Sequence, residues 1–152
     1  MAYKETSYEK LKNRQSKEFS EFPMFFAFSN GQFKEGMEKI GLTVDDTDKI
    51  YKTDAGGFYL KTDSKRLRNL IERHESEMSA ATAADTTGEG FVFEMFDYEL
   101  SNHEYCITGD TEDTLDALGF TREDIQASET LLHGLNKAIQ AQFDGRPGAW
   151  EQ

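Results

Sequence analysis

Cysteine, proline and tryptophan are scarce in this 152-residue chain, with one, two and one of each. A lone Cys106 excludes an internal disulfide bond and a zinc site built from several cysteines. No stretch approaches the roughly 18 apolar residues of a membrane span, so none is predicted. No apolar segment follows a basic N-terminus, so no signal peptide is predicted either. The simplest location is a reducing cytoplasm.

Basic residues are missing from a long part of the chain. Residues 74–121 contain no lysine and no arginine. The first eighty residues hold 14 acidic and 14 basic side chains, whereas residues 81–152 hold 15 and 3, which accounts for the whole net charge of −12. We call residues 74–121 the base-free stretch. It contains twelve carboxylates: Glu75, Glu77, Asp85, Glu89, Glu94, Asp97, Glu99, Glu104, Asp110, Glu112, Asp113 and Asp116.

The net charge restricts the partners that the chain can bind. A pI near 4.6 argues against direct binding to nucleic acid, because that affinity rests on lysines and arginines that neutralise phosphates. Anionic membrane surfaces are disfavoured for the same reason. Basic proteins and metal ions remain as partners.

The composition predicts one α+β domain over residues 1–143. Only 37% of the chain is apolar, but 12 phenylalanines and 6 tyrosines bury large areas each, so a core can form. We expect two to four short strands, a central β-hairpin and five or six helices. Residues 144–152 contain Gly145, Pro147 and Gly148 and are predicted to be a flexible tail.

Periodicity and capping residues place these elements. Residues 91–100 fit either a helix or an alternating strand, and their length favours the helix. Small polar residues at 80–90 predict a flexible loop. Short apolar runs predict strands at 24–28 and 105–108, and residues 48–60 predict the hairpin, with its turn at 54–57. Helices are predicted over residues 5–20, 30–40, 63–83, 91–103, 111–118 and 128–143.

A weak internal repeat connects the two predicted strands. Residues 26–29 precede a helix that ends at Gly41, and residues 105–108 precede one that ends at Gly119. The repeat is explained either by two βα units whose strands pair in one sheet or by a common strand–cap–helix pattern without further meaning.

Histidines are the first candidates for acid–base or metal chemistry. His74, His103 and His133 have no spacing typical of metal ligands. His103 lies near Glu104 and Cys106, the one local cluster, and supports an alternative hypothesis of a small metal-binding protein or enzyme that uses His103 with nearby carboxylates. No phosphate-binding or catalytic-serine motif occurs. We predict no cofactor, no metal site and no catalytic residue.

The base-free stretch carries the leading functional hypothesis, a non-enzymatic protein-binding module. Its carboxylates are also explained by the ordinary acidity of surface helices. If they converge on one face, they present spaced negative charges as a phosphate backbone does, and attract the basic grooves of nucleic-acid enzymes. Self-association through phenylalanine-rich segments is a further alternative. The predicted face comprises Glu94, Asp97, Glu99, Glu104, Asp110, Glu112, Asp113 and Asp116, with Tyr98 and Tyr105 as anchors.

Three stretches, Phe22–Phe28, Asn102–Cys106 and Asp113–Gly119, carry a resemblance. Along most of its length the chain resembles small uncharacterised acidic proteins encoded by phages and mobile elements of gut bacteria. The resemblance implies a role in the cytoplasm of a bacterial host. By analogy with other small acidic proteins of such elements, it also implies an inhibitor of a host defence or nucleic-acid-handling enzyme. It supplies no catalytic residues.

Overall fold

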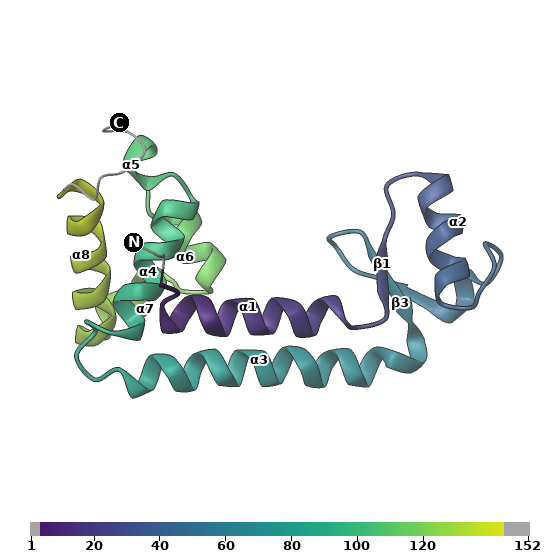
Figure 1. The fold of residues 1–152 in the computed structure, drawn as a ribbon, viewed down its shortest axis with the longest axis horizontal. Helices are drawn as coiled ribbons and strands as arrows, with labels where there is room; N and C mark the ends of the chain where they lie inside the picture. The colour runs from purple at the N-terminus through teal and green to yellow at the C-terminus, as the bar shows by residue number, and fades with distance from the viewer. Residues whose placement is uncertain (1–3, 145–152) are drawn as a thin grey trace. The chain divides into compact units, whose positions relative to one another are not determined.

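The computed structural model describes residues 4–144 and divides the chain into two compact units (Figure 1). Unit 1 comprises Met1–Asn13 and Glu77–Gln152, and unit 2 comprises Arg14–Ser76. The two boundaries fall inside helix α1 (Ser7–Ser20) and helix α3 (Ser64–Ala84). Each unit is described by itself below.

Unit 2 contains a three-stranded antiparallel sheet. Its strands are β1 (Met24–Phe26), β2 (Ile50–Lys52) and β3 (Gly57–Leu60), in the order β1-β3-β2. The predicted hairpin is confirmed as β2 and β3. The 3₁₀ turns Thr47–Lys49 and Lys61–Asp63 flank the hairpin.

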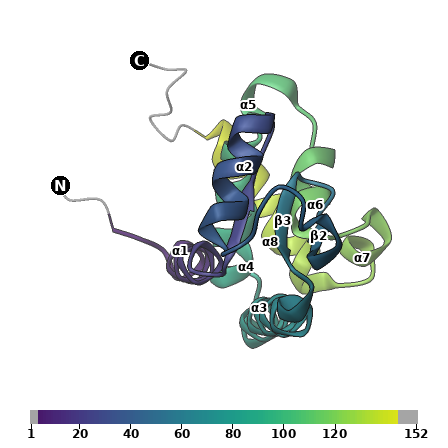
Figure 2. The ribbon, with the colours of Figure 1, turned by 90° about the vertical axis from the view of Figure 1, so that its right-hand side faces the viewer.

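Helix α2 (Asn30–Lys39) packs on one face of this sheet (Figure 2). Ser29 caps the helix by accepting a hydrogen bond from the backbone N–H of Gln32. Phe25 and Met37 are buried between helix and sheet. A Cβ on Gly36 would overlap the Phe25 ring, so a glycine is needed where the helix crosses it.

Unit 1 is built around helix α4 (Phe91–Asn102), which is buried along Val92, Met95, Phe96 and Leu100. The helical interpretation of residues 91–100 is therefore confirmed. Helix α8 (Glu129–Phe143) packs along α4, and its N-cap is Ser128. The crossing is close: a Cβ on Gly134 would lie 2.5 Å from Cγ1 of Val92 and 2.8 Å from the carbonyl oxygen of Gly88.

The predicted strand at 105–108 is wrong. These residues form a short helix, α5 (Tyr105–Thr108), between two left-handed residues, Glu104 (φ 57°) and Gly109 (φ 68°). A four-residue apolar run fits a strand or a helix equally well, and only a neighbouring strand stabilises the extended form. Tyr105 instead turns into the helical core, where it is 8% exposed.

The interpretation of the repeat as two βα units with paired strands is also wrong, because the second strand does not form. β1 pairs with β3 of the hairpin, not with residues 105–108. Helix α6 (Glu112–Leu118) does end at Gly119 as predicted, and α7 (Arg122–Gln126) begins at a capping box formed by Thr121 and Asp124. The similarity between the two stretches therefore reflects helix-capping residues.

The predicted loop at 80–90 is shorter and more ordered than expected. Helix α3 continues to Ala84, and Asp85 organises the remainder. Its Oδ1 accepts hydrogen bonds from the backbone N–H of Thr87 and Gly88, and its Oδ2 from those of Gly90 and Val92. Burial of the carboxyl raises the pKa of Asp85, but the four backbone donors lower it by more, so the pKa lies below its ordinary value of 3.8.

The α+β class is confirmed, with short strands, a hairpin and mostly helical structure. Residues 4–144 contain eight α-helices, two more than predicted, because α5 and α7 are very short. Within the same residues no helix has both the length and the apolar composition needed to cross a membrane. The predicted tail and Trp150 lie outside the described residues, apart from Asp144 at the C-cap of α8. The single-domain boundary at 143 stays a prediction.

Replacement of Gly134 by alanine should destabilise the protein. Alanine favours a helix interior by about 1 kcal/mol over glycine, but its methyl group would overlap Val92 and the Gly88 carbonyl. We expect the clash to outweigh the propensity and lower the free energy of unfolding by about 1–3 kcal/mol, measured by chemical denaturation. Gly31→Ala in α2 is the control, since nothing lies within 4 Å of its Cβ. A Gly134→Ala variant as stable as the wild type would contradict the close helix contact.

Replacement of Asp85 by asparagine should destabilise the protein in a pH-dependent way. Asparagine has one acceptor oxygen, so two of the four N–H groups lose their partner, at a cost of about 1–2 kcal/mol near pH 7. Because the folded-state pKa is lowered, the wild-type advantage is full above pH ~5 and is lost as the pH falls through that pKa. Denaturation from pH 7 to pH 3 measures the difference. The exposed Asp45→Asn is the control, and an equal pH dependence in both variants would contradict the role of Asp85.

Candidate functional site

The net charge of the protein belongs to one unit. Unit 2 holds 11 basic and 11 acidic residues, whereas unit 1 holds 6 basic and 18 acidic ones, so unit 1 carries the whole net charge of −12. The predicted site residues all belong to unit 1. They fall into an inner group, which holds helices together, and an exposed group.

Glu94 and Asp97 belong to the inner group. Oε1 of Glu94 accepts hydrogen bonds from Oγ of Ser7 at 2.6 Å and from the backbone N–H of Tyr8 at 3.2 Å, which caps the first turn of α1. Oδ1 of Asp97 accepts a hydrogen bond from Nε2 of the buried Gln142 at 3.0 Å, which ties α4 to α8. Both carboxylates are half-buried and do structural work in unit 1.

Tyr98 also lies against α1. Its ring centroid is 5.7 Å from that of Tyr8, and Nζ of Lys12 lies 4.8 Å from the centroid of the Tyr98 ring. An ammonium group at this distance is attracted to the face of the ring. Tyr98 is therefore half-buried in the packing of unit 1, with less of its ring available to a partner than predicted.

Glu99 is the largest departure from the predicted face, since it is only 2% exposed. Its carboxylate accepts a hydrogen bond from the hydroxyl of Tyr8 and forms an ion pair with Nζ of Lys12 at 2.5 Å. Burial, together with the hydrogen bond to Glu99, raises the pKa of Tyr8 above its usual range. A buried carboxylate requires such partners, and the sequence offers no local signal for them because Tyr8 lies 91 residues away.

The exposed group forms one continuous stretch, residues 104–117, which we call the acidic segment. Within it only Tyr105, Thr114 and Leu115 are buried. Oε1 of Glu112 pairs with Arg122 at 2.7 Å, and Oδ1 of Asp110 accepts from the backbone N–H of Glu112 at 2.9 Å. Its exposed carboxylates are those of Glu104, Asp110, Glu112, Asp113 and Asp116.

An apolar group stands within the acidic segment. Ile107 is 76% exposed and follows the exposed Cys106 on α5. The preceding Glu104 has φ 57°, a conformation that costs a residue with a side chain about 1 kcal/mol or more. Tyr105 fixes the turn by packing against Phe143, with ring centroids 5.8 Å apart. The turn thus presents an isoleucine among carboxylates.

His103 does not have the surroundings that the alternative hypothesis requires. Its Nδ1 lies 2.8 Å from the carbonyl oxygen of Glu99 and 3.9 Å from Oε1 of the same residue. That carboxylate already serves Tyr8 and Lys12. Within residues 4–144, the structure gathers no group of three metal-ligating side chains that includes His103. Cys106 is exposed.

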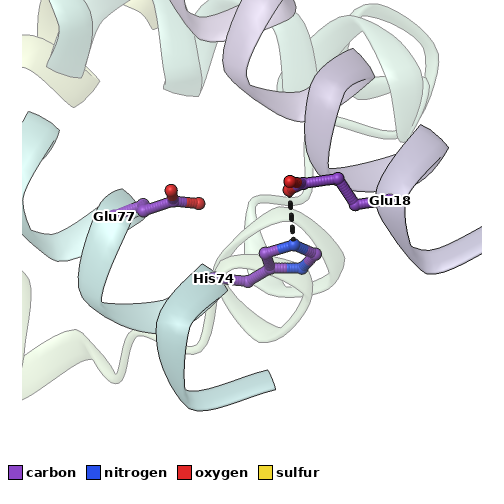
Figure 3. A group of neighbouring side chains, drawn as sticks. All are labelled: Glu18, His74 and Glu77. Carbon is purple, nitrogen blue, oxygen red and sulfur yellow. Dashed lines mark hydrogen bonds and ion pairs between the residues drawn. The ribbon is translucent and has the colours of Figure 1, made fainter. Parts of the chain in front are cut away.

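Another histidine–carboxylate pair lies in unit 2. Nε2 of His74 is 3.0 Å from Oε1 of Glu18 (Figure 3). Arg14 and Arg73 donate to the same carboxylate at 3.0 and 3.3 Å. Hydrogen bonds from Arg73 and His74 lower the pKa of Glu18. These donors satisfy the Glu18 carboxylate, so we interpret the pair as a structural contact between α1 and α3 within unit 2. Glu77, which Figure 3 also draws, belongs to unit 1.

The fold defines an α+β protein whose helical unit carries an exposed acidic segment. Residues 7–141 match a family of unknown function (DUF7659), and the chain belongs to that family. No curated protein and no solved structure matches it. The predicted resemblance to uncharacterised proteins is confirmed, and the phage origin stays a prediction.

Replacement of Tyr8 by phenylalanine should destabilise unit 1 without changing its shape. The variant keeps the ring but removes one of the three donors to the buried Glu99 carboxylate, and leaves those from Lys12 and Asn102. We expect the free energy of unfolding to fall by about 1–3 kcal/mol, measured by chemical denaturation. The matched control is Tyr51→Phe, whose hydroxyl belongs to an exposed side chain and should change stability by less than about 0.5 kcal/mol. Equal stabilities of the two variants would contradict the role of the hydroxyl.

Proposed function

We propose that this protein is a non-enzymatic binding module whose acidic segment contacts a basic protein. The observation that carries the proposal is the exposure of residues 104–117, with five carboxylates and no lysine or arginine. The rest of the predicted face does not contribute in the same way, because Glu94, Asp97 and Tyr98 serve the packing of unit 1.

Electrostatics support a basic partner. The nearest basic residue after the segment, Arg122, is paired with Glu112, so four of the five carboxylates have no cationic side chain within ion-pair distance among residues 4–144. Together with these five carboxylates, the unit that carries the segment has a net charge of −12. Such a field speeds the association of a positively charged surface and weakens with salt.

The exposed isoleucine supports a protein partner over a metal ion or a diffuse counter-ion cloud. Interfaces concentrate binding energy in a few apolar or aromatic anchors surrounded by a polar rim. Ile107 has this setting, since Glu104 and Asp110 lie on either side of it in the chain. The left-handed turn at Glu104 holds the anchor outward, and strain of this kind is common at functional sites.

The finer proposal concerns the partner. Spaced carboxylates imitate the charge of a phosphate backbone, so a nucleic-acid-binding groove is the basic surface that fits them best. With the resemblance to proteins of phages and mobile elements, this points to a host defence or nucleic-acid-handling enzyme that the acidic segment inhibits by occupying its groove. The analogy alone supports the inhibitory role.

Reversal of charge in the acidic segment should abolish partner binding. The variant Glu104→Lys, Asp113→Lys, Asp116→Lys changes the net charge by six and avoids the Glu112–Arg122 pair and the Asp110 turn. We expect a partner captured from bacterial lysate by the wild-type chain at low salt to be lost with this variant and lost with the wild type at high salt. Mass spectrometry identifies the captured protein.

The control is Glu35→Lys, Glu38→Lys, Asp45→Lys, which makes the same change of charge on exposed residues of unit 2. It should retain the partner. Loss of the partner with both variants would show a dependence on net charge alone, and retention with both would overturn the assigned surface.

A further inference from the structure

We propose that unit 2 binds single-stranded nucleic acid on the face of its sheet opposite α2. We call this the aromatic face; it consists of Met24, Phe26, Tyr51 and Tyr59. It belongs to the unit that carries no net charge and goes beyond the binding function proposed for the acidic segment.

Strand register places these side chains together. Met24 pairs with Tyr59, and Tyr59 pairs with Tyr51, so the three lie in one row across the sheet. Phe26 lies on the same side as Met24, two residues along β1. The alternate residues Phe25, Phe58 and Ile50 point toward α2 and form the core. The fold therefore uses one face of the sheet for packing and leaves the aromatic face open.

Two of the three rings on this face are exposed, and Tyr59 between them is half-buried. Phe26 is 48% exposed and Tyr51 is 46% exposed, and the two tyrosine rings lie 5.9 Å apart at 54°. An open groove of about 380 Å³ runs from Tyr59 along α3. Leu67, Arg68 and Ile71 line it, together with Glu72 and Glu75 at its far end, and Ile71 is 42% exposed. A chain of stacked bases needs such a surface, with ring faces on a sheet and a groove beside them.

The hairpin and the start of α3 carry an excess of basic residues although the protein is acidic, and the carboxylates of the adjoining groove, Glu72 and Glu75, lie beyond this stretch. Residues 49–68, which comprise the hairpin and the start of α3, contain six basic residues and two acidic ones. One of the acidic residues, Asp63, pairs with Arg66 at 3.1 Å. Nζ of Lys61 lies 5.2 Å from the centroid of the Tyr51 ring. The basic residues are Lys49, Lys52, Lys61, Lys65, Arg66 and Arg68. Lys49 is paired with Asp46 at 3.5 Å, and Lys52 lies on the α2 side of the sheet beside Phe58, so Lys61, Lys65 and Arg68 are the residues offered to phosphates.

This combination favours nucleic acid over another protein. Every base has a face that stacks on tyrosine, and the adjoining lysines neutralise the phosphates that accompany each base. Single strands fit, because the bases of a duplex are stacked on each other and unavailable. The pI of the whole chain, which argued against nucleic acid, is set by unit 1 and does not describe the charge of residues 49–68.

Fluorescence anisotropy with labelled 20-mers of uridine and of thymidine tests the proposal on the full chain at 50 mM salt. We expect saturable binding that weakens with salt and does not extend to a duplex of equal length. Tyr51→Ile with Tyr59→Ile keeps the strand propensity and removes the rings. Its affinity should fall at least about fivefold per ring, the lower end of what a stacked base contributes.

A second double variant, Lys61→Gln with Arg68→Gln, tests the phosphate contacts and leaves the core intact. Removal of two contacts should lower the slope of log affinity against log salt by about 1.4. The matched control is Lys34→Gln with Lys39→Gln on α2, which removes the same charge from another part of unit 2 and should bind as the wild type does.

Several results would overturn the proposal. They are the absence of wild-type binding to both oligonucleotides, unchanged affinity in the isoleucine variant, and equal loss in the α2 control. Light scattering provides a further test. A wild-type dimer that becomes a monomer in the isoleucine variant would also overturn the proposal, because a second copy would then cover the aromatic face. Circular dichroism checks that each variant is folded. If the isoleucine variant is unfolded, the affinity and salt dependence of the Lys61→Gln, Arg68→Gln variant test the proposal instead.

Discussion

The buried carboxylate of Glu99 is the constraint on which unit 1 depends. A carboxylate removed from water costs several kcal/mol unless charge and hydrogen bonds replace its hydration. Tyr8 and Lys12 supply both, so the first helix must lie where it can reach α4. Glu94 adds to this by capping the same helix. One acidic residue in the middle of the chain therefore draws the N-terminal residues into the helical unit, and the carboxylates of the acidic segment are left on the outside.

The division of charge follows from this arrangement. Unit 1 keeps its acidic excess exposed, and unit 2 balances its charges within itself. Each unit then offers a surface of a different kind: carboxylates around Ile107 in one, tyrosines and lysines on a sheet in the other. The two proposed surfaces differ in chemistry and call for two different partners, or for one partner complex that contains both protein and nucleic acid. Salt is expected to weaken both proposed contacts, so ionic strength alone does not distinguish them and substitutions are needed.

Local chemistry made much of the fold predictable. The predicted helices at 30–40 and 128–143 do form, and Ser29 and Ser128 cap them by accepting backbone hydrogen bonds from Gln32 and Leu131. The hairpin followed from two apolar runs around a glycine-rich turn, and α4 followed from its length and periodicity. Residues 105–108 were not predictable, because a run of four residues carries too little periodicity to separate strand from helix. The candidate site was half predictable: the carboxylates of the acidic segment were named correctly as surface groups, but Glu99 was placed on the surface and is buried.

The sequence by itself determined most of the helix and strand segments, the net charge and its concentration in the second half of the chain. These properties depend on neighbours within a few residues or on simple counting. Only the tertiary structure decided which carboxylates face water. Glu99 and Glu104 are five residues apart and chemically identical, yet one is enclosed and the other exposed, because α1 arrives from 91 residues away to cover the first. Solvation is set by whatever packs against a group, and that is a property of the whole fold.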